Sequence, residues 1–561
     1  MRAPRSFWRD RILICLAVLL SYASVWPNEF VFDDNVLIQA NTFLKTPQGL
    51  FKIFTHLNGA GAGWHAGFYR PVPMAAHFFI YWFSYPLTVA FHMPLTLGFH
   101  ALNVALQALN GCLLLAFGVR AGFGKNAALA AALLWAVHPL HVEAVAYMNS
   151  TPELMCGTFC LLGLITLLPK EAPADGVVDP QKAFTPRKIK LSLVPFALAL
   201  LSKESAVVFP ALAAATLFLI SPERLRLSAY FRTWPLWLLS FAYTLIIVFV
   251  ILGHGMDGPL NLADVSLYKS SVAVRVWTAL GTLPSYARLI VWPKDLYFRR
   301  EGKVFADPAH GRVLLGGALV LLAALQILWG RAKRGLALSF GLLWFAAAQS
   351  PNTGIATPID AIISEHWMYL PTMGLFLGVA QSFAGLFRDK KQAAALLVAA
   401  LTTALGVATF RQNMVWRDMD TLYRNTARHG GGLTEMHGNE ALFLMSRQQF
   451  GAARRQAQRA LAGLPQNHGQ ASALMHMLMA MAWLHVAPVG GWAFTPDALR
   501  RALPEARHVD EAVAELEESV RINPDDADTH AFLSIVYAFR GDKKQAAAQD
   551  KIANQLRKKD E

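Results

Sequence analysis

The stretch Ala127-Ala-Leu-Ala-Ala-Ala-Leu-Leu-Trp-Ala-Val-His-Pro-Leu-His-Val-Glu143 is an apolar run that ends in two histidines, a proline and a glutamate. Ionisable side chains at the edge of a bilayer are costly unless they face water, a partner or a substrate. A second stretch, Phe30-Val-Phe-Asp-Asp-Asn35, follows the first apolar run and puts Asp33 and Asp34 in the same situation. If both ends emerge on one side of a membrane, they form an acidic pocket at its surface.

The apolar runs predict an all-α, polytopic membrane protein. The chain of 561 residues is 55% hydrophobic and has a mean hydropathy of +0.35, which is too apolar for a soluble protein of this length. Runs near the roughly twenty residues that span a bilayer occupy 10–26, 95–118, 127–147, 154–168, 191–220, 234–253, 313–329, 336–349, 367–387 and 392–410. Lys203-Glu204 interrupts 191–220, so we expect two short helices joined by a turn there, and about eleven crossings in all.

The net charge of +14 does not predict nucleic-acid binding, because much of the basic charge lies in short segments beside the apolar runs, where it sets topology. The four cysteines, Cys15, Cys112, Cys156 and Cys160, all lie in or beside apolar runs, which argues against a disulfide framework. Cys156 and Cys160 are one helical turn apart, but no histidine or carboxylate at ligand spacing accompanies them. We interpret them as packing residues.

Basic residues mark the cytoplasmic ends of membrane helices. The arginines of residues 1–11 therefore predict a cytoplasmic N-terminus on an uncleaved first helix, followed by a first external loop over 27–94. Basic segments bring the chain back inside at 120–125, 170–190, 222–232, 331–334 and 388–391. We expect a bacterial inner membrane, with the C-terminal region in the periplasm.

Segment 272–293 leaves two topologies open. Its two arginines, proline and tyrosine are typical of an interfacial or re-entrant helix, and that interpretation keeps 331–334 inside. In the alternative, 272–293 crosses the membrane and 191–220 is one tilted helix, which puts Lys203 within the membrane. Both topologies place the C-terminal region outside.

The preferred topology gathers ionisable residues from several helix ends on the external face, where they form the candidate site. They are Asp33, Asp34, Tyr69, Arg70, His138, Glu143, Glu153, Lys203, Glu204, Glu365 and His366. Charges scattered over both faces would instead have favoured a purely structural explanation.

The composition becomes polar and charged near the end of the last apolar run, which divides the chain into a membrane domain over 1–412 and a second domain over 413–561. Around 439–461 and 531–547, a helix, a short turn and an alanine-rich helix recur. This pattern resembles tetratricopeptide repeats, which have a period of about thirty-four residues and stack into a solenoid with a concave binding surface. A third unit near 470–523 is lengthened by a Gly/Pro/Trp segment. The alternative is an irregular helical domain.

Several motifs together resemble a known family. Their order along the chain is Phe32-Asp-Asp34, Tyr69-Arg-Pro71, Phe99-His-Ala-Leu-Asn103, His138-Pro-Leu-His-Val-Glu-Ala-Val145, Leu201-Ser-Lys-Glu204, Glu365-His-Trp-Met-Tyr-Leu-Pro371 and Trp416-Arg-Asp418, followed by the repeats. The chain resembles the transmembrane and tetratricopeptide-repeat-containing O-mannosyltransferases and their prokaryotic relatives, which are C-type glycosyltransferases (GT-C fold). The resemblance covers nearly the whole chain, and the order and spacing of the motifs are more specific than any one of them.

The resemblance implies a multi-pass enzyme that takes a sugar from a polyprenyl-phosphate carrier and transfers it, with inversion, to an acceptor on the lumenal or periplasmic side. It also implies that the first external loop carries the catalytic acidic residue, which matches Asp33. In two places the chain departs from the family. It has Ser150-Thr-Pro-Glu153 where relatives often have Gly-Arg before an acidic residue, and Glu365-His366 where they often have Glu-Arg.

The transfer needs a base for the acceptor hydroxyl. We assign this role to Asp33, because proton removal by a positioned carboxylate contributes roughly 10² to 10⁴-fold and the neighbouring Asp34 can raise its pKa. The alternative is that the pair caps a helix or binds a cation. We expect Glu143 and His141 to orient sugar or acceptor hydroxyls. For His138 we favour a structural role at the end of its helix over a chemical one.

The transfer also needs positive charge for the departing phosphate. Lys203 is the first candidate, because a purely structural lysine between two apolar helices would be costly. Arg70 is the second, because a guanidinium can bind phosphate oxygens in bidentate fashion, although a loop salt bridge would explain it equally well. Protonated His366 could assist, and Tyr69 could stack on a sugar face.

The expected partners are a lipid-linked sugar donor and an acceptor, which we take to be a protein serine or threonine held by the repeats, by analogy with other solenoids. No metal is required, although the carboxylates could take a divalent cation. Three alternatives remain open: a lipid or glycan acceptor, a non-enzymatic transporter of lipid-linked sugars, and an assembly scaffold with a membrane anchor.

Overall fold

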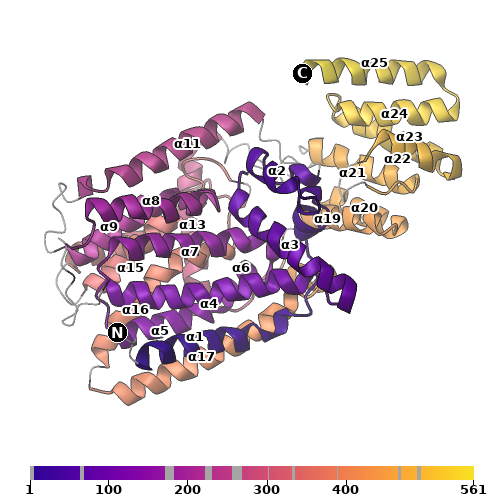
Figure 1. Cartoon of the computed structure of the whole chain (residues 1–561). Coiled ribbons are helices and arrows are strands. Elements are labelled where there is room, and N and C mark those ends of the chain that lie inside the picture. Colours follow the sequence, from indigo (N-terminus) through magenta and orange to yellow (C-terminus); the bar gives the residue numbers. More distant parts are fainter. Residues whose placement is uncertain are drawn as a thin grey trace. The chain divides into compact units, whose positions relative to one another are not determined.

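The computed structural model describes residues 5–62, 68–170, 178, 182–221, 230–254, 268, 270–300, 302–330, 335–359, 361–387, 389–431, 433–464, 469–488 and 494–560. Every regular element in these ranges is a helix (Figure 1), which confirms the predicted all-α class. The chain divides into two compact units. The first is Met1–Phe30, Phe68–Gly255 and Leu267–Asn425, and the second is Val31–Gly67, Met256–Ser266 and Thr426–Glu561. The sequence placed the boundary at 412 and assigned segment 31–67 to the membrane domain.

The first unit is a bundle of long helices, and each predicted apolar run forms one or two of them (Figure 1). These are α1 (Arg5–Ser21), α4 (Thr96–Arg120), α5 (Lys125–Ala136), α7 (Thr151–Leu167), α8 (Pro186–Leu200), α9 (Phe209–Ile220), α11 (Trp234–His254), α14 (Gly311–Trp329), α15 (Leu336–Gln349), α16 (Tyr369–Leu386) and α17 (Lys391–Asn413). Apolar side chains that remain exposed on α11, α14 and α17 are those expected to face lipid.

Four helices of the described residues are long and apolar enough to cross a membrane, and a bent pair would make a fifth. They are Thr96–Arg120, Met148–Leu167, Gly311–Trp329 and Lys391–Trp416, and the bent pair is Lys125–Ala136 with Pro139–Ala146. The sequence predicted about eleven crossings. Glu204–Ile220 and Trp234–Phe249 are apolar but too short to be counted with the others.

Two further helices bear on the predicted topology. Residues Pro71–Phe91, which we expected to lie within an external loop, form the 21-residue helix α3. Val272–Val291, which was left open between an interfacial and a crossing helix, forms one continuous helix, α13, despite the proline at position 284. Neither helix is among those long and apolar enough to count as a candidate span.

The interruption at Lys203-Glu204 has the predicted structure. Helix α8 ends at Leu200, the short helix η7 covers Glu204–Val208, and α9 begins at Phe209. The Lys203 backbone is extended there (φ −156°, ψ 137°). The two short helices therefore present both charged side chains from the turn between them.

A second break follows α5, where His138-Pro139 bends the chain by 54°. Proline disfavours the helical conformation of the residue before it, and His138 is indeed extended, with ψ at 128°. The short helices η5 (Pro139–His141) and α6 (Val142–Ala146) follow this bend. The bend thus places Glu143 on α6, beyond the end of α5.

A ladder of polar side chains fixes the register between α4 and α7. Asn103 Oδ1 accepts a hydrogen bond from Thr151 Oγ1 at 2.7 Å, and Asn110 Oδ1 accepts one from Thr158 Oγ1 at 2.7 Å. Along each helix, the two bonding residues are seven positions apart, or about two helical turns. Tyr369 at the start of α16 donates to Gln107 Oε1 at 2.6 Å. Such bonds between buried helices restrict sliding, so the first turns of α7 and α16 are held in place.

The second unit contains paired helices of the kind predicted for the repeats (Figure 1). They are α19 (Leu433–Ser446) with α20 (Phe450–Gly463), α21 (Gly469–Trp483) with α23 (Val509–Ile522), and α24 (Ala527–Arg540) with α25 (Lys543–Asp560). In the lengthened middle pair, the short α22 (Pro496–Ala502) lies between α21 and α23 in sequence. At the last turn, Gly541 adopts a left-handed conformation (φ 94°), which is typical of a glycine that ends a helix.

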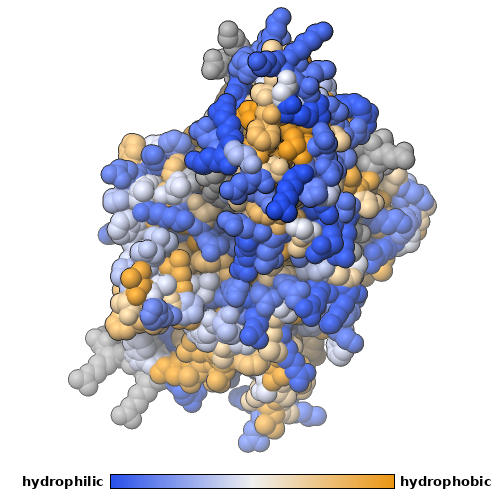
Figure 2. Space-filling view, turned by 90° about the vertical axis from the view of Figure 1, so that its right-hand side faces the viewer, coloured by the Kyte–Doolittle hydropathy of each residue, from blue (hydrophilic) through white to orange (hydrophobic). Residues whose placement is uncertain are grey.

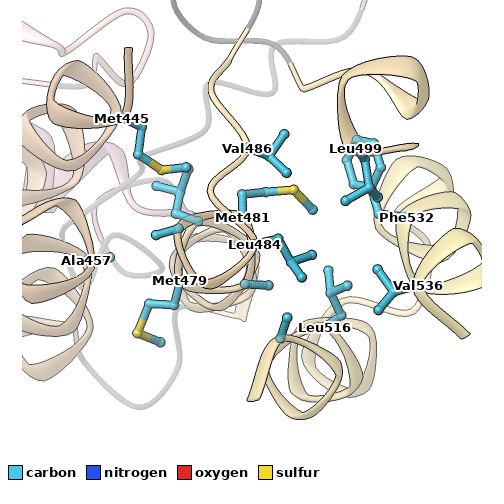
Figure 3. Close-up of a cluster of buried hydrophobic side chains, with 14 of the residues drawn as sticks. Met445, Ala457, Met479, Met481, Leu484, Val486, Leu499, Leu516, Phe532 and Val536 are labelled. Carbon is cyan, nitrogen blue, oxygen red and sulfur yellow. The ribbon is translucent and has the colours of Figure 1, made fainter. Parts of the chain in front are cut away.

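The core of these pairs is rich in methionine, leucine and alanine (Figure 3). Met481 and Leu484 of the α21 region lie near Leu516 of the paired helix α23 and Phe532 of α24 in the next pair. Small alanines such as Ala457 allow the close approach of helices that repeat proteins require. Figure 2 shows mostly hydrophilic side chains on the side of the molecule that it presents, interrupted by smaller apolar patches.

Candidate active site

The centre of the candidate site is a buried ion pair between Lys203 Nζ and Glu153 Oε1. Lys203 comes from the turn before η7, and Glu153 from the first turn of α7. Their side chains are only 8% and 7% exposed. Removing either partner would leave an uncompensated buried charge. The Lys203 ammonium and the Glu153 carboxylate therefore stabilise each other.

His366 connects this pair to Glu143. His366 Nδ1 lies 2.7 Å from Glu143 Oε1, and its backbone N–H donates to Glu143 Oε2 at 3.0 Å. His366 Nε2 lies 3.2 Å from Glu153 Oε1. The imidazole can donate to both carboxylates only when both of its nitrogens carry protons. Glu143, His366, Glu153 and Lys203 therefore form one continuous line of ionisable groups.

Arg70 and Glu204 form a second ion pair close to this line. Arg70 Nε and Nη2 donate to Glu204 Oε2 and Oε1 at 2.9 and 2.6 Å, a bidentate arrangement. The Arg70 guanidinium also lies 4.4 Å from the centre of the Phe68 ring. The sequence left open a loop salt bridge of Arg70, for instance to Asp33 or Asp34; the partner in the structure is Glu204. Tyr69 is partly buried, and this burial raises the pKa of its phenol.

A third ion pair joins Glu365 to a residue that the sequence did not suggest. Arg300 Nη2 donates to Glu365 Oε1 at 2.8 Å, and the Tyr297 backbone N–H donates to the same oxygen at 2.9 Å. Arg300 lies in the segment between α13 and α14, after two aromatic residues. The basic doublet Arg299-Arg300, which follows segment 272–293, was the signal in the sequence that could have indicated this residue.

Burial and the nearby Glu143 carboxylate raise the pKa of Glu365 to about 8. Because both protein donors reach Oε1, the other oxygen of Glu365 is the one that can carry the proton. Glu365 thus differs from an ordinary carboxylate, and perturbed acids of this kind are common at functional sites.

We expect Glu365→Gln to flatten the pH dependence of thermal stability. The folded-state pKa of Glu365 lies above the ordinary value of about 4.3, so its contribution to folding is complete below that value and is lost as the pH rises to about 8. Thermal unfolding of the detergent-solubilised protein should show a wild-type midpoint that falls by a few degrees over this window. Glutamine keeps the acceptor oxygen but does not titrate. An equal fall in both proteins would show that Glu365 is ionised throughout.

His138 and His141 both take part in the packing of the bend. His138 Nε2 donates to the Ile290 carbonyl at 3.0 Å, and its Nδ1 accepts from the Leu140 N–H at 3.2 Å. His141 Nδ1 donates to the Trp135 carbonyl at 2.8 Å, and its Nε2 lies 3.1 Å from Thr372 Oγ1. His141 is completely buried and both of its nitrogens are satisfied. In the structure both histidines bond to neighbouring groups of the bend, and the predicted role of His141 in orienting hydroxyls stays a prediction.

Asp33 and Asp34 belong to the second unit. Their side chains differ in burial, although the two residues are adjacent in one turn. Phe32 has φ at 49°, which is strained for a bulky residue and is found mainly where the surrounding structure imposes it. The Asp34 carboxylate is completely buried and accepts the Val31 N–H at 3.3 Å. The Asp33 side chain is partly exposed. Solvent therefore reaches Asp33, whereas Asp34 stabilises the turn.

The described residues contain no group of three or more His, Cys, Asp or Glu side chains placed to hold a metal ion. Within these ranges, three acids of the site each contact a protein cation: Glu153 contacts Lys203, Glu204 contacts Arg70, and Glu365 contacts Arg300.

Fold and site together define the class: an all-α, membrane-type protein whose apolar helices carry a network of acids and cations, most of them buried. No family model matches the chain. Three curated relatives are named protein O-mannosyl-transferases, and the resemblance predicted from the motifs is thereby confirmed.

The human relative TMTC4 is 23% identical over 75% of this chain and 61% of its own length. The Drosophila melanogaster relative Tmtc3 is 24% identical over 75% of this chain and 51% of its own length. F38B6.6 of Caenorhabditis elegans is 31% identical over 29% of this chain and 24% of its own length. The chain thus spans less than two thirds of each. A crystal structure of the Archaeoglobus fulgidus oligosaccharyltransferase aligns with 82% of this chain and 60% of that chain, at 13% identity and a TM-score of 0.35.

Proposed function

We propose that this protein is a membrane glycosyltransferase of the GT-C type, which transfers a sugar from a polyprenyl-phosphate carrier to an acceptor hydroxyl at the external face of the membrane. The observation that carries the proposal is the line Lys203–Glu153–His366–Glu143, with the Arg70–Glu204 pair close to it. Charges buried in an apolar bundle are retained for function rather than for stability. The names of the relatives supply the reaction class.

In the proposed reaction, the acceptor oxygen attacks the anomeric carbon of the sugar from the side opposite the carrier. The bond between that carbon and the phosphate oxygen breaks, and its electron pair leaves with the polyprenyl phosphate. The hydroxyl proton passes to the Asp33 carboxylate. One displacement gives inversion at the anomeric carbon.

Asp33 is preferred over Asp34 as the base because of the local geometry. The Asp34 carboxylate is buried and holds the Val31 N–H, whereas Asp33 is partly exposed. A base must come within hydrogen-bond reach of the proton that it removes, and the partly exposed Asp33 side chain is the more open of the two to an acceptor.

The site cations would stabilise the negative charge that builds up on the departing phosphate. Lys203 and Arg70 are each bound to a carboxylate, Glu153 and Glu204 respectively. The carrier phosphate must therefore compete with these carboxylates. Once released, Glu153 and Glu204 would be available to accept hydrogen bonds from sugar hydroxyls.

The acceptor is proposed to be a serine or threonine of a protein, held by the paired helices of the second unit. Stacked helix pairs commonly offer a concave surface to extended peptides. The sugar is expected to be mannose or another hexose.

The experiment that tests the function uses the full chain in proteoliposomes, a radiolabelled polyprenyl-phosphate mannose and serine/threonine-rich peptides. Peptides with every serine and threonine replaced by alanine are the matched control. We expect label in the first set only, with the anomeric configuration opposite to that of the donor. Label that appears in lipid or glycan would show that the acceptor is not a protein. Movement of the donor across the bilayer without transfer to any acceptor would favour a transporter.

A further inference from the structure

The three cations of the site differ in how fully the protein uses their donors. Lys203 is paired with Glu153, and the Nε and Nη2 atoms of Arg70 both bind Glu204. Arg300 uses only Nη2, which donates to Glu365 Oε1 at 2.8 Å and to the Asp295 carbonyl at 2.6 Å. Its Nε is buried and makes no hydrogen bond. Within the described residues, Arg300 therefore keeps a buried Nε–H group that is directed at no acceptor.

Burial and an aromatic contact hold the Arg300 guanidinium in place. Its side chain is 9% exposed, and its guanidinium lies 4.0 Å from the centre of the Tyr297 ring. A buried N–H of a charged group without an acceptor is costly. A fixed guanidinium with a spare donor is the arrangement that proteins use to bind phosphate oxygens.

The charge of Arg300 is also not fully cancelled. The Glu365 oxygen that it binds also accepts the Tyr297 N–H, which leaves the second oxygen of Glu365 free to hold a proton. Burial and Glu143 raise the pKa of Glu365 to about 8, so this acid carries its proton at neutral pH. The Arg300–Glu365 contact then pairs a cation with a neutral acid, and an incoming anion meets a net positive charge.

Arg300 is connected to the rest of the site through Glu365, to which it binds. Glu365 precedes His366, whose backbone N–H and Nδ1 bind the two oxygens of Glu143. An anion at Arg300 would therefore lie close to the line of groups that includes Glu153 and Lys203.

We propose that Arg300 binds the phosphate of the lipid-linked donor, with its Nε donating to a phosphate oxygen. This inference deepens the proposed function and rests on it, because it names the group that the donor presents to the site. Arg300 makes this contact through Nε, while its Nη2 bond to Glu365 stays in place.

The test measures binding of undecaprenyl phosphate, without sugar, to the detergent-solubilised full chain. Arg300→Gln is expected to weaken this binding by roughly 10- to 150-fold, the equivalent of one charge-assisted hydrogen bond. Arg300→Lys keeps the charge but lacks Nε, so a smaller loss is expected. Arg312→Gln removes an exposed arginine at the start of α14 and is the matched control, with binding unchanged.

Two further ligands separate the sources of the phosphate. Inorganic phosphate should compete with undecaprenyl phosphate in the wild type and lose this ability in Arg300→Gln. Phosphatidylglycerol, whose phosphate is a diester, should compete less well than the monoester. Competition by phosphatidylglycerol equal to that of the monoester would overturn the assignment to the carrier and make Arg300 a general lipid contact.

The failure of this inference can be distinguished from failure of the proposed function. If the wild type binds undecaprenyl phosphate through Arg300 but transfers no sugar, the function is wrong and the phosphate site stands. If the wild type transfers sugar while Arg300→Gln and Arg300→Lys bind the carrier with wild-type affinity, the inference is wrong. Should Arg300→Gln fail to fold, Arg300→Lys decides, because a merely structural role for the cation would leave its carrier affinity and donor KM unchanged.

Discussion

Asp33→Asn is expected to lower sugar transfer by roughly 10² to 10⁴-fold, because asparagine cannot accept the proton of the acceptor hydroxyl. The substitution keeps the size of the side chain, and Asp33 is partly exposed, so the fold should be unaffected. The initial rate of label transfer from polyprenyl-phosphate sugar to acceptor peptide measures the effect. The KM for the donor should change little, since the base acts on the acceptor.

Asp34→Asn provides the comparison. The Asp34 carboxylate is buried and accepts the Val31 N–H beside the strained Phe32, so its loss should reduce stability more than activity per folded molecule. Wild-type transfer by Asp33→Asn would contradict the mechanism. A loss of transfer in folded Asp34→Asn alone would move the base to the neighbouring residue.

Lys203→Gln is expected to destabilise the protein by about 3 to 5 kcal/mol, because it leaves the buried Glu153 without its cation. Both side chains are less than a tenth exposed, so solvent cannot replace the lost partner. Denaturant or thermal unfolding in detergent measures the change. Glu153→Gln combined with Lys203→Gln removes both charges and should recover part of the loss, as a double-mutant cycle will show.

Arg424→Gln is the control for this experiment. Arg424 and Asp420 also form an ion pair, but their side chains are 66% and 65% exposed. Exposed pairs contribute about 0 to 1 kcal/mol. Equal small effects of Lys203→Gln and Arg424→Gln would show that Glu153 is protonated or hydrated when Lys203 is absent, and that the buried line is not held together by charge.

Much of the local structure followed from the sequence. Each apolar run forms a helix, and the charged interruption at Lys203-Glu204 forms the predicted turn. His138-Pro139 bends the chain where proline restricts its neighbour. These features depend on residues close together in the chain, so composition and spacing are enough to predict them. The 21-residue helix α3 was missed because its polar and aromatic residues reduce its hydropathy.

The sequence alone also identified most of the acids and cations of the site, because charge within an apolar chain is conspicuous. Only the tertiary structure decided which of them meet. Lys203 and Glu153 are 50 residues apart, Arg70 and Glu204 are 134 apart, and His366 and Glu143 are 223 apart. Such pairs depend on the register of packed helices, which the Asn103–Thr151 and Asn110–Thr158 bonds fix. Arg300 stayed hidden for the same reason: whether a polar side chain is already satisfied depends on neighbours that come from distant parts of the chain.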